Sequence, residues 1–312
     1  MRALVTGATG FVGDHLVRHL VESGDEVVGT YIPAAGLPPF EKVAGCEYLK
    51  CDVTEASTVT SIVSRFRPDA VYHLAAIAFV PEAEDDFNRT LAINVGGVNN
   101  VVRACHLAQL GSALLFISSA EVYGRTVAKN LPLTEETPIN PANNYSLSKA
   151  MGELVVHRYA QFGYVRGIIA RPFNHIGPKQ NDRFVVSSFA RQLARIAKGD
   201  VEPIIRVGNL TAQRDFSDVR DIVRAYRLAV LNGSGVFNLC SGQAVPISQI
   251  LEDLIEISGV EVKVEQDPAR MRASETPILY GSYAKAEREL GWRPQIDLKE
   301  SLRDVYNMWL AA

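Results

Sequence analysis

Tyr145 and Lys149 are the residues of this chain best suited to proton transfer. They stand four positions apart, so on a helix their side chains would share one face. A free tyrosine has a pKa of about 10, but a nearby ammonium group stabilises the phenolate and lowers that pKa. Ser119, in the upstream run SSAEVYG, could hydrogen-bond the substrate oxygen that exchanges a proton with Tyr145. These three residues predict proton transfer at a substrate oxygen.

The start of the chain predicts a strand, a glycine-rich turn and a helix. A short apolar run precedes TGATGFVG, and apolar residues at helical spacing follow it. Gly7 can adopt turn dihedrals that a side chain forbids, Gly10 lets backbone N–H groups approach a pyrophosphate, and Gly13 allows close helix–strand packing. A purely structural turn is the alternative, but the position after a first strand favours a dinucleotide site. The expected cofactor contacts here are Gly7, Thr9, Gly10, Phe11, Val12 and Gly13.

Later strands end in residues that suit the same ligand edge. Asp52, after a strand at residues 47–50, could accept a hydrogen bond from an adenine amino group or cap the helix beginning near Thr54. The run AVYHLAA predicts a buried strand whose small final residues let a cofactor lie against the backbone. Asn94, on a helix expected from about 90 to 107, could tie strand ends together or contact the cofactor. These segments add Asp52, Val53, Leu74, Ala75, Ala76 and Asn94 to the expected cofactor site.

The end of the second strand, expected at residues 26–30, commonly selects between NAD and NADP. An acid there would bond the adenosine ribose of NAD, and an arginine would accept the 2′-phosphate of NADP. This chain has Thr30, Tyr31 and Ile32, followed by a segment rich in proline and glycine. Neither determinant is present. The lack of an acid favours NADPH over NADH, since a carboxylate would repel the phosphate.

Composition excludes several classes of protein. The chain has 312 residues, of which 47% are hydrophobic and 21% charged, so it can bury a large core. A formal net charge of −3 without a lysine- and arginine-rich cluster argues against nucleic-acid binding. No apolar run is long enough to span a bilayer and no signal-peptide pattern is present, so we expect no membrane partner and a cytoplasmic location. The four cysteines lack metal-ligand spacing, which predicts reduced thiols and no metal site.

The motifs TGATGFVG, CDV, HLAA, SSAEVYG and YSLSK, in this order and spacing, resemble the extended short-chain dehydrogenase/reductase family over essentially the whole chain. The resemblance implies an enzyme that uses NADPH or NADH and acts on a nucleotide sugar. Ser119, Tyr145 and Lys149 match the catalytic residues of that family. Two helices of the family, matching residues 90–107 and 146–161, usually form a four-helix bundle between two copies, so we expect a homodimer.

The family resemblance also implies the fold class, which is α/β, with a doubly wound (Rossmann) parallel sheet and a smaller carboxyl-terminal lobe for the substrate. Residues 1–172 would form the dinucleotide-binding domain and residues 173–312 the substrate lobe. A strand at residues 237–240 indicates that the first domain also includes about residues 221–244. Helices are expected at 248–258, 283–290 and 298–310, and Trp292 is expected to anchor the packing between the lobes.

The second half resembles the branch of the family that acts on GDP-mannose derivatives, through RPFNHIGP, FVVSSFARQ, VGNL and RDFSDVRD. Arginine forks bind phosphate oxygens, and a carboxylate suits ribose hydroxyl groups. The resemblance implies a GDP-linked 4-keto-6-deoxyhexose, whose C4 ketone is reduced to give GDP-D-rhamnose. Val185 and Val186 would flank the guanine. The implied substrate-binding residues are Asn174, Lys179, Val185, Val186, Arg214, Arg272 and Glu275.

The presence of Glu121 is also consistent with a second reaction. Related 4,6-dehydratases carry a glutamate two residues after the serine, where it moves protons on the sugar, whereas a reductase needs no such base. GDP-mannose 4,6-dehydration is therefore one alternative, as is epimerisation of a nucleotide sugar. In a reductase, Glu121 would instead contact a substrate hydroxyl group. A binding protein that senses NAD(P) without turnover is the alternative outside enzymes, but it would not need the complete set of Ser119, Tyr145 and Lys149.

Overall fold

The computed structural model describes residues 1–33, 40–125, 130–271 and 276–312. A seven-stranded parallel sheet with the strand order β11-β6-β5-β4-β1-β2-β3 lies at its centre. The strand order changes direction between β1 and β4, which is where doubly wound sheets bind ligands. This architecture confirms the fold class that the sequence predicts. The strands are β1 (Arg2–Thr6), β2 (Glu26–Tyr31), β3 (Cys46–Lys50), β4 (Ala70–His73), β5 (Ala113–Ile117), β6 (Arg166–Pro172) and β11 (Gly235–Leu239).

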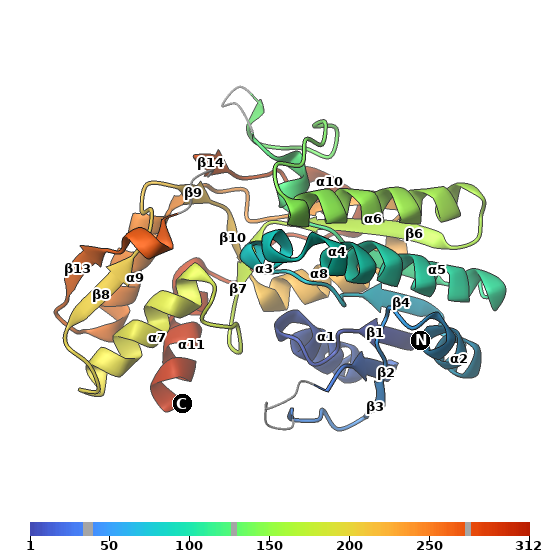
Figure 1. The fold of residues 1–312 in the computed structure, drawn as a ribbon, viewed down its shortest axis with the longest axis horizontal. Coiled ribbons are helices and arrows are strands. Elements are labelled where there is room, and N and C mark those ends of the chain that lie inside the picture. The colour runs from blue at the N-terminus through green and yellow to red at the C-terminus, as the bar shows by residue number, and fades with distance from the viewer. Residues whose placement is uncertain (34–39, 126–129, 272–275) are drawn as a thin grey trace.

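Helices cover both faces of the sheet (Figure 1). On one face α1 (Phe11–Glu22) packs against α8 (Val219–Asn232), and on the other face α2 (Ala56–Phe66) packs against α5 (Gly97–Leu107), which contacts α6 (Asn144–Gln161). Because both faces are covered, the central strands β1, β4 and β5 are apolar on both sides, as is typical of parallel sheets, whereas the edge strand β3 exposes Glu47 and Lys50.

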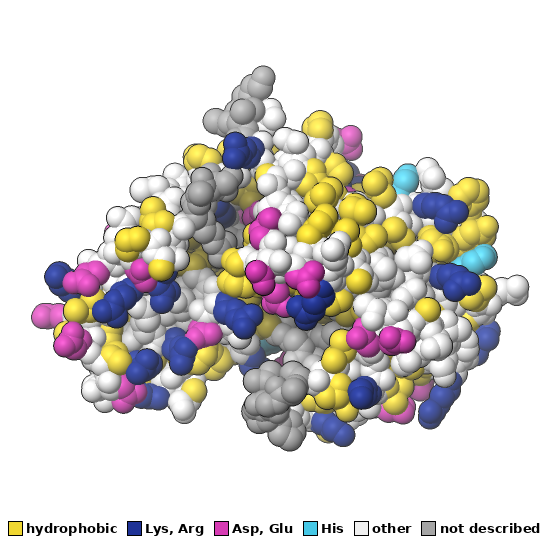
Figure 2. All heavy atoms as spheres, in the orientation of Figure 1, with side chains coloured by type: hydrophobic (Ala, Val, Ile, Leu, Met, Phe, Trp, Pro, Cys, Tyr) yellow, Lys and Arg dark blue, Asp and Glu magenta, His cyan; other side chains and the backbone are white. Residues whose placement is uncertain are grey.

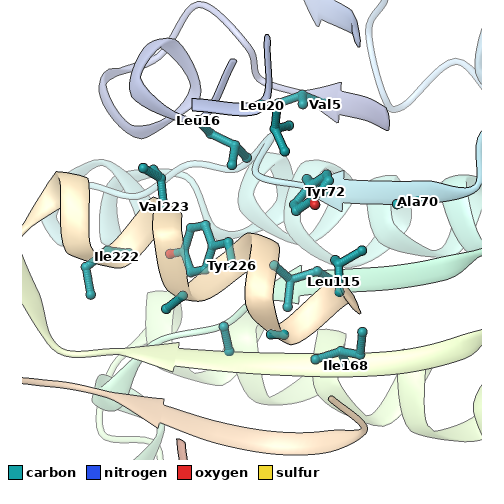
Figure 3. Packing of buried hydrophobic residues seen from close by; sticks show 14 of the residues in the cluster. Val5, Leu16, Leu20, Ala70, Tyr72, Leu115, Ile168, Ile222, Val223 and Tyr226 are labelled. Carbon is teal, nitrogen blue, oxygen red and sulfur yellow. The ribbon is translucent and has the colours of Figure 1, made fainter. Parts of the chain in front are cut away.

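The core on the α1 and α8 side is drawn in Figure 3. Val5 and Tyr72, from β1 and β4, lie in the same cluster as Leu16 and Leu20 of α1 and Tyr226 of α8. All five side chains are fully buried. This layer fixes the position of α1 relative to β1, and with it the glycine turn that joins them.

The chain returns to the large sheet after building part of a second lobe. β11 pairs with β6, and α10 (Ala284–Leu290) packs against α8 and β11. Trp292 is completely buried in the same core, where its indole Nε1–H donates to the Asp221 carbonyl oxygen at 2.9 Å. The returning segment therefore extends beyond residues 221–244, because α10 also lies against the sheet layer.

Among the described residues, three α-helices and three small sheets form the main part of the second lobe. Its core contains Val186, Phe189, Ile250, Leu254 and Val305, which come from the three helices. The helices are α7 (Val185–Ala197), α9 (Ile247–Ser258) and α11 (Leu298–Ala311). The strand pairs are β7 (Asn174–Ile176) with β10 (Phe216–Asp218), β8 (Ile204–Val207) with β13 (Lys263–Gln266), and β9 (Gln213–Arg214) with both β12 (Val245–Pro246) and β14 (Ile278–Leu279).

The helix expected from about residue 90 to 107 differs from the structure. It is built from α4 (Phe87–Leu91), a π-helical turn η1 (Ala92–Gly96) and α5, and the short α3 (Val80–Asp85) precedes it. A π-turn holds one extra residue and is common at functional sites. The turn contains Asn94, whose side-chain hydrogen bonds leave the helix for neighbouring segments. Hydrophobic periodicity does not reveal such an insertion.

All four cysteines are free thiols, and three of them are buried. Within the described ranges, no group of three histidine, cysteine, aspartate or glutamate side chains is arranged to hold a metal ion. A search of the same residues finds no helix with the length and apolar character that crossing a membrane requires.

Candidate active site

Ser119, Tyr145 and Lys149 meet at the carboxyl end of β5. The Ser119 hydroxyl lies close enough to the Tyr145 hydroxyl to lower the pKa of that phenol. The Lys149 ammonium nitrogen lies 5.9 Å from the centroid of the Tyr145 ring and donates to the Ile117 carbonyl oxygen at 2.7 Å. The structure therefore brings together the three side chains that their spacing in the sequence predicts to be neighbours.

The start of α6 is held by a reciprocal cap. The Asn143 side chain accepts from the Ser146 N–H at 2.7 Å, and the Ser146 hydroxyl oxygen accepts from the Asn143 N–H at 3.1 Å. Such a capping box satisfies two donors that would otherwise lack partners in the first helical turn. Because Tyr145 lies in that turn, the cap fixes the position of its ring.

Burial dominates the acidity of both groups. Burial raises the pKa of Tyr145 to about 12, against the opposing effect of the Ser119 hydrogen bond. Burial also lowers the pKa of Lys149 to about 7, against the opposing charge of Glu153. In this structure desolvation of the phenolate is the largest influence on the pKa of Tyr145, and the stabilisation of that phenolate by Lys149 stays a prediction. At neutral pH Tyr145 carries its proton, as a proton donor must.

Glu121 lies beside this group, in the 3₁₀ helix η2 (Ala120–Tyr123). Its backbone N–H donates to the Ser119 hydroxyl oxygen at 3.2 Å, and its carboxylate accepts from the Asn143 amide at 3.4 Å. The negative charge of Glu121 contributes to the raised pKa of Tyr145. A carboxylate is thus positioned near the proton donor.

The glycine turn forms a cradle that side chains would fill. Gly7 has a φ of +70°, and a Cβ there would lie 3.0 Å from the Ala75 nitrogen. A Cβ on Gly13 would lie 2.2 Å from the Gly7 oxygen. Gly10 precedes α1 and offers no side-chain cap to its first N–H groups. Exposed donors at a helix N-terminus suit a pyrophosphate, so the turn fits the dinucleotide that the motif implies.

The remaining residues of the turn lie at its surface. Thr9, Phe11 and Val12 are half-buried. The Phe11 ring stacks on His175 with a centroid separation of 6.0 Å and an interplanar angle of 11°. This contact joins the cofactor turn to the RPFNHIGP segment of the second half.

The structure shows which hydrogen bonds Asp52 and Asn94 make within the protein. One Asp52 carboxylate oxygen accepts from the N–H and the hydroxyl group of Thr54, at 2.9 and 2.7 Å, while α2 begins only at Ala56. Asp52 therefore forms a local turn and is not the residue that caps α2. Asn94 is buried and exchanges hydrogen bonds with the backbone of Ile77 at 2.8 and 3.1 Å.

Asn94 also donates to the Ser148 hydroxyl oxygen at 2.9 Å, so it ties the segment after β4 to α6. Val53 is buried, whereas Leu74, Ala75 and Ala76 are half-buried next to the glycine turn. The small residues at the end of β4 therefore lie directly beside the glycine turn, and their contact with a cofactor stays a prediction.

The expected substrate residues are spread over the second lobe and the region where it meets the first. Asn174 is half-buried in β7, directly after β6. Arg214 is half-buried in β9, where its guanidinium group donates to the Gln213 carbonyl oxygen at 2.9 Å. Val185 and Val186 begin α7, but Val185 is 36% exposed and Val186 is 1% exposed. Only Val185 is accessible, because Val186 belongs to the core of the second lobe.

Lys179 is held by carboxylates of the first lobe. Its ammonium nitrogen lies 3.0 Å from Asp14 and 3.2 Å from Glu41, and its backbone has a φ of +73°. It lies beside α1 and does not join the group at β5. Arg272 and Glu275 lie outside the described residues.

A buried ion pair behind Lys149 was missed by reasoning from the sequence. Arg171 donates to both carboxylate oxygens of Glu153, at 2.9 and 2.7 Å, and Ser118 donates to the same carboxylate. The signal that could have revealed it is an arginine at the end of the apolar strand run GIIARP. Charged residues are almost never fully buried unless they are paired.

A doubly wound parallel sheet, a glycine turn after its first strand, and serine, tyrosine and lysine at the end of β5 define an extended short-chain dehydrogenase/reductase. This class consists of NAD(P)-dependent oxidoreductases. A family model described as GDP-mannose 4,6 dehydratase matches residues 4–305, and the chain belongs to that family.

Similar proteins include reductases and epimerases of nucleotide sugars. GDP-6-deoxy-D-mannose reductase of Pseudomonas aeruginosa is 38% identical over 310 residues, which cover 99% of this chain and 97% of that protein. The solved structure of RMD from Pseudomonas aeruginosa complexed with NADPH has a TM-score of 0.86 at 36% identity and covers 100% of this chain and 99% of that one. UDP-glucose 4-epimerase of Thermus thermophilus in complex with NAD has a TM-score of 0.88 at 28% identity, with 99% of each chain covered.

Proposed function

We propose that this chain reduces the C4 ketone of GDP-4-keto-6-deoxy-D-mannose to form GDP-D-rhamnose, with NADPH or NADH as the reductant. The observation that carries this proposal is that Ser119, Tyr145 and Lys149 meet at the ligand edge of the sheet, with the Lys149 nitrogen 5.9 Å from the Tyr145 ring centroid. The similarity to the reductase of Pseudomonas aeruginosa supports the choice of substrate.

The chemistry follows from three side chains. When bound, the dihydronicotinamide supplies a hydride to the carbonyl carbon. The Ser119 hydroxyl donates to the ketone oxygen and polarises it, and Tyr145 gives its proton to that oxygen as the alcohol forms. Lys149 then stabilises the phenolate that Tyr145 becomes, because a nearby ammonium favours the charged form of the phenol.

The backbone around the glycine turn would hold the cofactor. Gly7 and Gly13 allow the tight turn and the close packing of α1, and Gly10, whose Cβ would meet only the Gly7 oxygen at 3.4 Å, leaves its backbone open to a pyrophosphate at the start of α1. Thr30, at the end of β2, is buried and is not an acid that would repel a 2′-phosphate. This supports NADPH as the preferred reductant.

The position of Glu121 supports 4,6-dehydration of GDP-mannose as the second candidate function. Its carboxylate lies close enough to Tyr145 to affect the pKa of that phenol. A base near the donor could move protons on the sugar ring. In this reaction the cofactor would be reduced and reoxidised within each turnover, so no net consumption of NADPH would occur.

One assay separates these candidate functions. The purified chain is mixed with NADPH and GDP-4-keto-6-deoxymannose, the absorbance of NADPH is followed, and the product is examined by NMR. A reductase oxidises one NADPH for each sugar and yields GDP-D-rhamnose. In a parallel mixture with GDP-mannose in place of the keto sugar, consumption of GDP-mannose without net change in NADPH would instead indicate the dehydratase. NADPH binding without oxidation with either sugar would indicate a sensing protein.

We infer further that two copies pair through α5 and α6. Leu107 of α5 and Leu147 and Leu154 of α6 are 54, 41 and 65% exposed, and Phe162, directly after α6, is 63% exposed. Leu147 and Leu154 stand two helical turns apart, so they share one face of α6. Figure 2 shows hydrophobic side chains gathered over α6. Exposed apolar patches of this kind mark interaction sites, which supports a four-helix bundle between two copies.

A further inference from the structure

Successive residues at the end of β5 each contact a different turn of α6. Helix positions spaced by four lie on one face, so the contacts form a ladder between the strand end and the helix. The ladder continues one turn beyond the lysine. Its three rungs are Ser119 with Tyr145, Ile117 with Lys149, and Ser118 with Glu153.

In the last of these contacts, Ser118 with Glu153, the carboxylate is also bound by a buried arginine. Glu153 and Arg171 are 5 and 6% exposed, and the guanidinium group binds both carboxylate oxygens. Arg171 also donates to the Tyr123 hydroxyl oxygen at 3.0 Å, and its guanidinium carbon lies 4.9 Å from the centroid of that ring. Tyr123 in turn donates to Asn238 of β11 at 2.7 Å. The Glu153 carboxylate is therefore fixed from η2, β6 and the end of β5.

We propose that Glu153, one helical turn beyond Lys149 on the same face of α6 and anchored by Ser118 and Arg171, is a positioning residue that favours the charged form of Lys149, and that the Arg171 charge limits this effect. Lys149 is almost completely buried, and its pKa is about 7 because burial opposes the ammonium charge. The carboxylate of Glu153 counteracts that burial. Catalysis by Tyr145 would thus depend on a carboxylate that touches no reactant.

The other groups near Lys149 do not replace this role. His73 of β4 is buried with a pKa of about 3, so it is neutral and supplies no negative charge. Tyr145 keeps its proton at neutral pH because its pKa is about 12. Glu121 acts on Tyr145, and η1 carries no titratable side chain. His73 from β4 and Glu153 from α6 interact electrostatically with Lys149, and the Tyr145 ring lies 5.9 Å from its nitrogen, whereas Arg171 from β6 is bound to the Glu153 carboxylate.

The test compares two substitutions that change the local charge in opposite directions. Glu153→Gln removes the negative charge and leaves the Arg171 cation behind, so Lys149 should lose its proton at a pH lower by about one unit. Arg171→Met leaves the carboxylate without its partner, so Lys149 should keep its proton to a higher pH. The double variant should fall between the two single variants.

The protonation of Lys149 is read directly by NMR of the full-length protein labelled with ¹³Cε-lysine, with Lys149→Arg used to assign the signal. This readout does not depend on the reaction, so it tests the inference even if the proposed function fails. The activity readout rests on the proposed function: the alkaline limb of kcat for the keto sugar should move with the NMR midpoint. An inactive wild-type protein would contradict the proposed function alone.

Two opposite shifts would support the positioning role. Equal shifts in one direction, or no shift in either variant, would overturn it, because a merely structural pair would change stability without moving the titration of Lys149. If Glu153→Gln does not fold, Ser118→Ala removes one hydrogen bond to the carboxylate and leaves the ion pair in place. Because this hydroxyl, like the Arg171 cation, offsets the charge of the carboxylate, the NMR midpoint should rise by a smaller amount than in Arg171→Met, and an unchanged midpoint would also overturn the proposal.

Discussion

The Lys149 ammonium group donates to the Ile117 carbonyl oxygen at 2.7 Å, which fixes a buried cation at the end of β5. The same helix face carries Tyr145 one turn earlier, and the Tyr145 hydroxyl lies close to that of Ser119. A proton donor and the cation that stabilises its conjugate base are therefore held by one strand end and one helix. The proposed reduction depends on this arrangement.

The rate of reduction should fall as the pH rises through about 7. Burial lowers the pKa of Lys149 from 10.5 to about 7, so the ammonium form is present below this pH and is lost above it. Tyr145 retains its proton across this range because its pKa is about 12. We expect kcat with saturating keto sugar and NADPH to be level on the acid side and to decline on the alkaline side. A kcat that rises steadily to about pH 10 would contradict this assignment.

Two alanine substitutions in the glycine turn should have different effects. At Gly13 a Cβ would lie 2.2 Å from the Gly7 oxygen, so Gly13→Ala should strongly destabilise the fold. At Gly10 the nearest atom would be 3.4 Å away, so Gly10→Ala should keep the fold but weaken NADPH binding roughly tenfold, about 1.4 kcal/mol. Thermal unfolding and fluorescence titration with NADPH measure the two effects. Equal NADPH affinity in Gly10→Ala and the parent would show that the pyrophosphate does not approach this turn.

Replacing Glu121 by glutamine should distinguish the two candidate reactions. Glu121→Gln retains an acceptor for the Asn143 amide and removes the base. A reductase should keep its kcat within about threefold, since Tyr145 alone supplies the proton. Any conversion of GDP-mannose to its 4-keto-6-deoxy derivative should disappear. Loss of the reductase activity by about a hundredfold would show instead that Glu121 takes part in reduction.

A charge placed on the exposed face of α6 should separate the proposed dimer. Leu154 is 65% exposed, so Leu154→Arg should leave the monomer folded and lower its mass in light scattering to that of one chain. Leu231 of α8 is 46% exposed and provides a matched control outside the proposed interface. Leu231→Arg should leave the dimer intact. A parent protein that is monomeric at micromolar concentration would remove the basis for this proposal.

Much of the fold could be predicted because the apolar runs of the sheet have clear ends. The strand at 113–117 and the helix ending at Ser258 lie where hydrophobic patterning placed them, within about one residue. The return of β11 to the sheet was also expected. The π-turn around Asn94 was not, since its extra residue depends on tertiary contacts with Ile77 and Ser148.

Those features of the candidate site that depend on burial could not be predicted from the sequence. The spacing of Tyr145 and Lys149 indicated that they are neighbours, but not that desolvation controls both pKa values. Glu153 and Arg171 stand 18 positions apart on different elements, so only the fold could pair them. The burial of the Val186 side chain likewise depends on how the second lobe packs, so the sequence alone did not reveal it.

Replacing Tyr145 by phenylalanine tests the central claim most directly. The substitution keeps the ring and removes the proton, so kcat for reduction of GDP-4-keto-6-deoxymannose should fall by about 10² to 10⁴. The affinity for NADPH should stay within about twofold. Tyr159→Phe, which removes another hydroxyl from α6, should keep the parent rate. A Tyr145→Phe variant that retains more than about a tenth of the parent kcat would contradict the account.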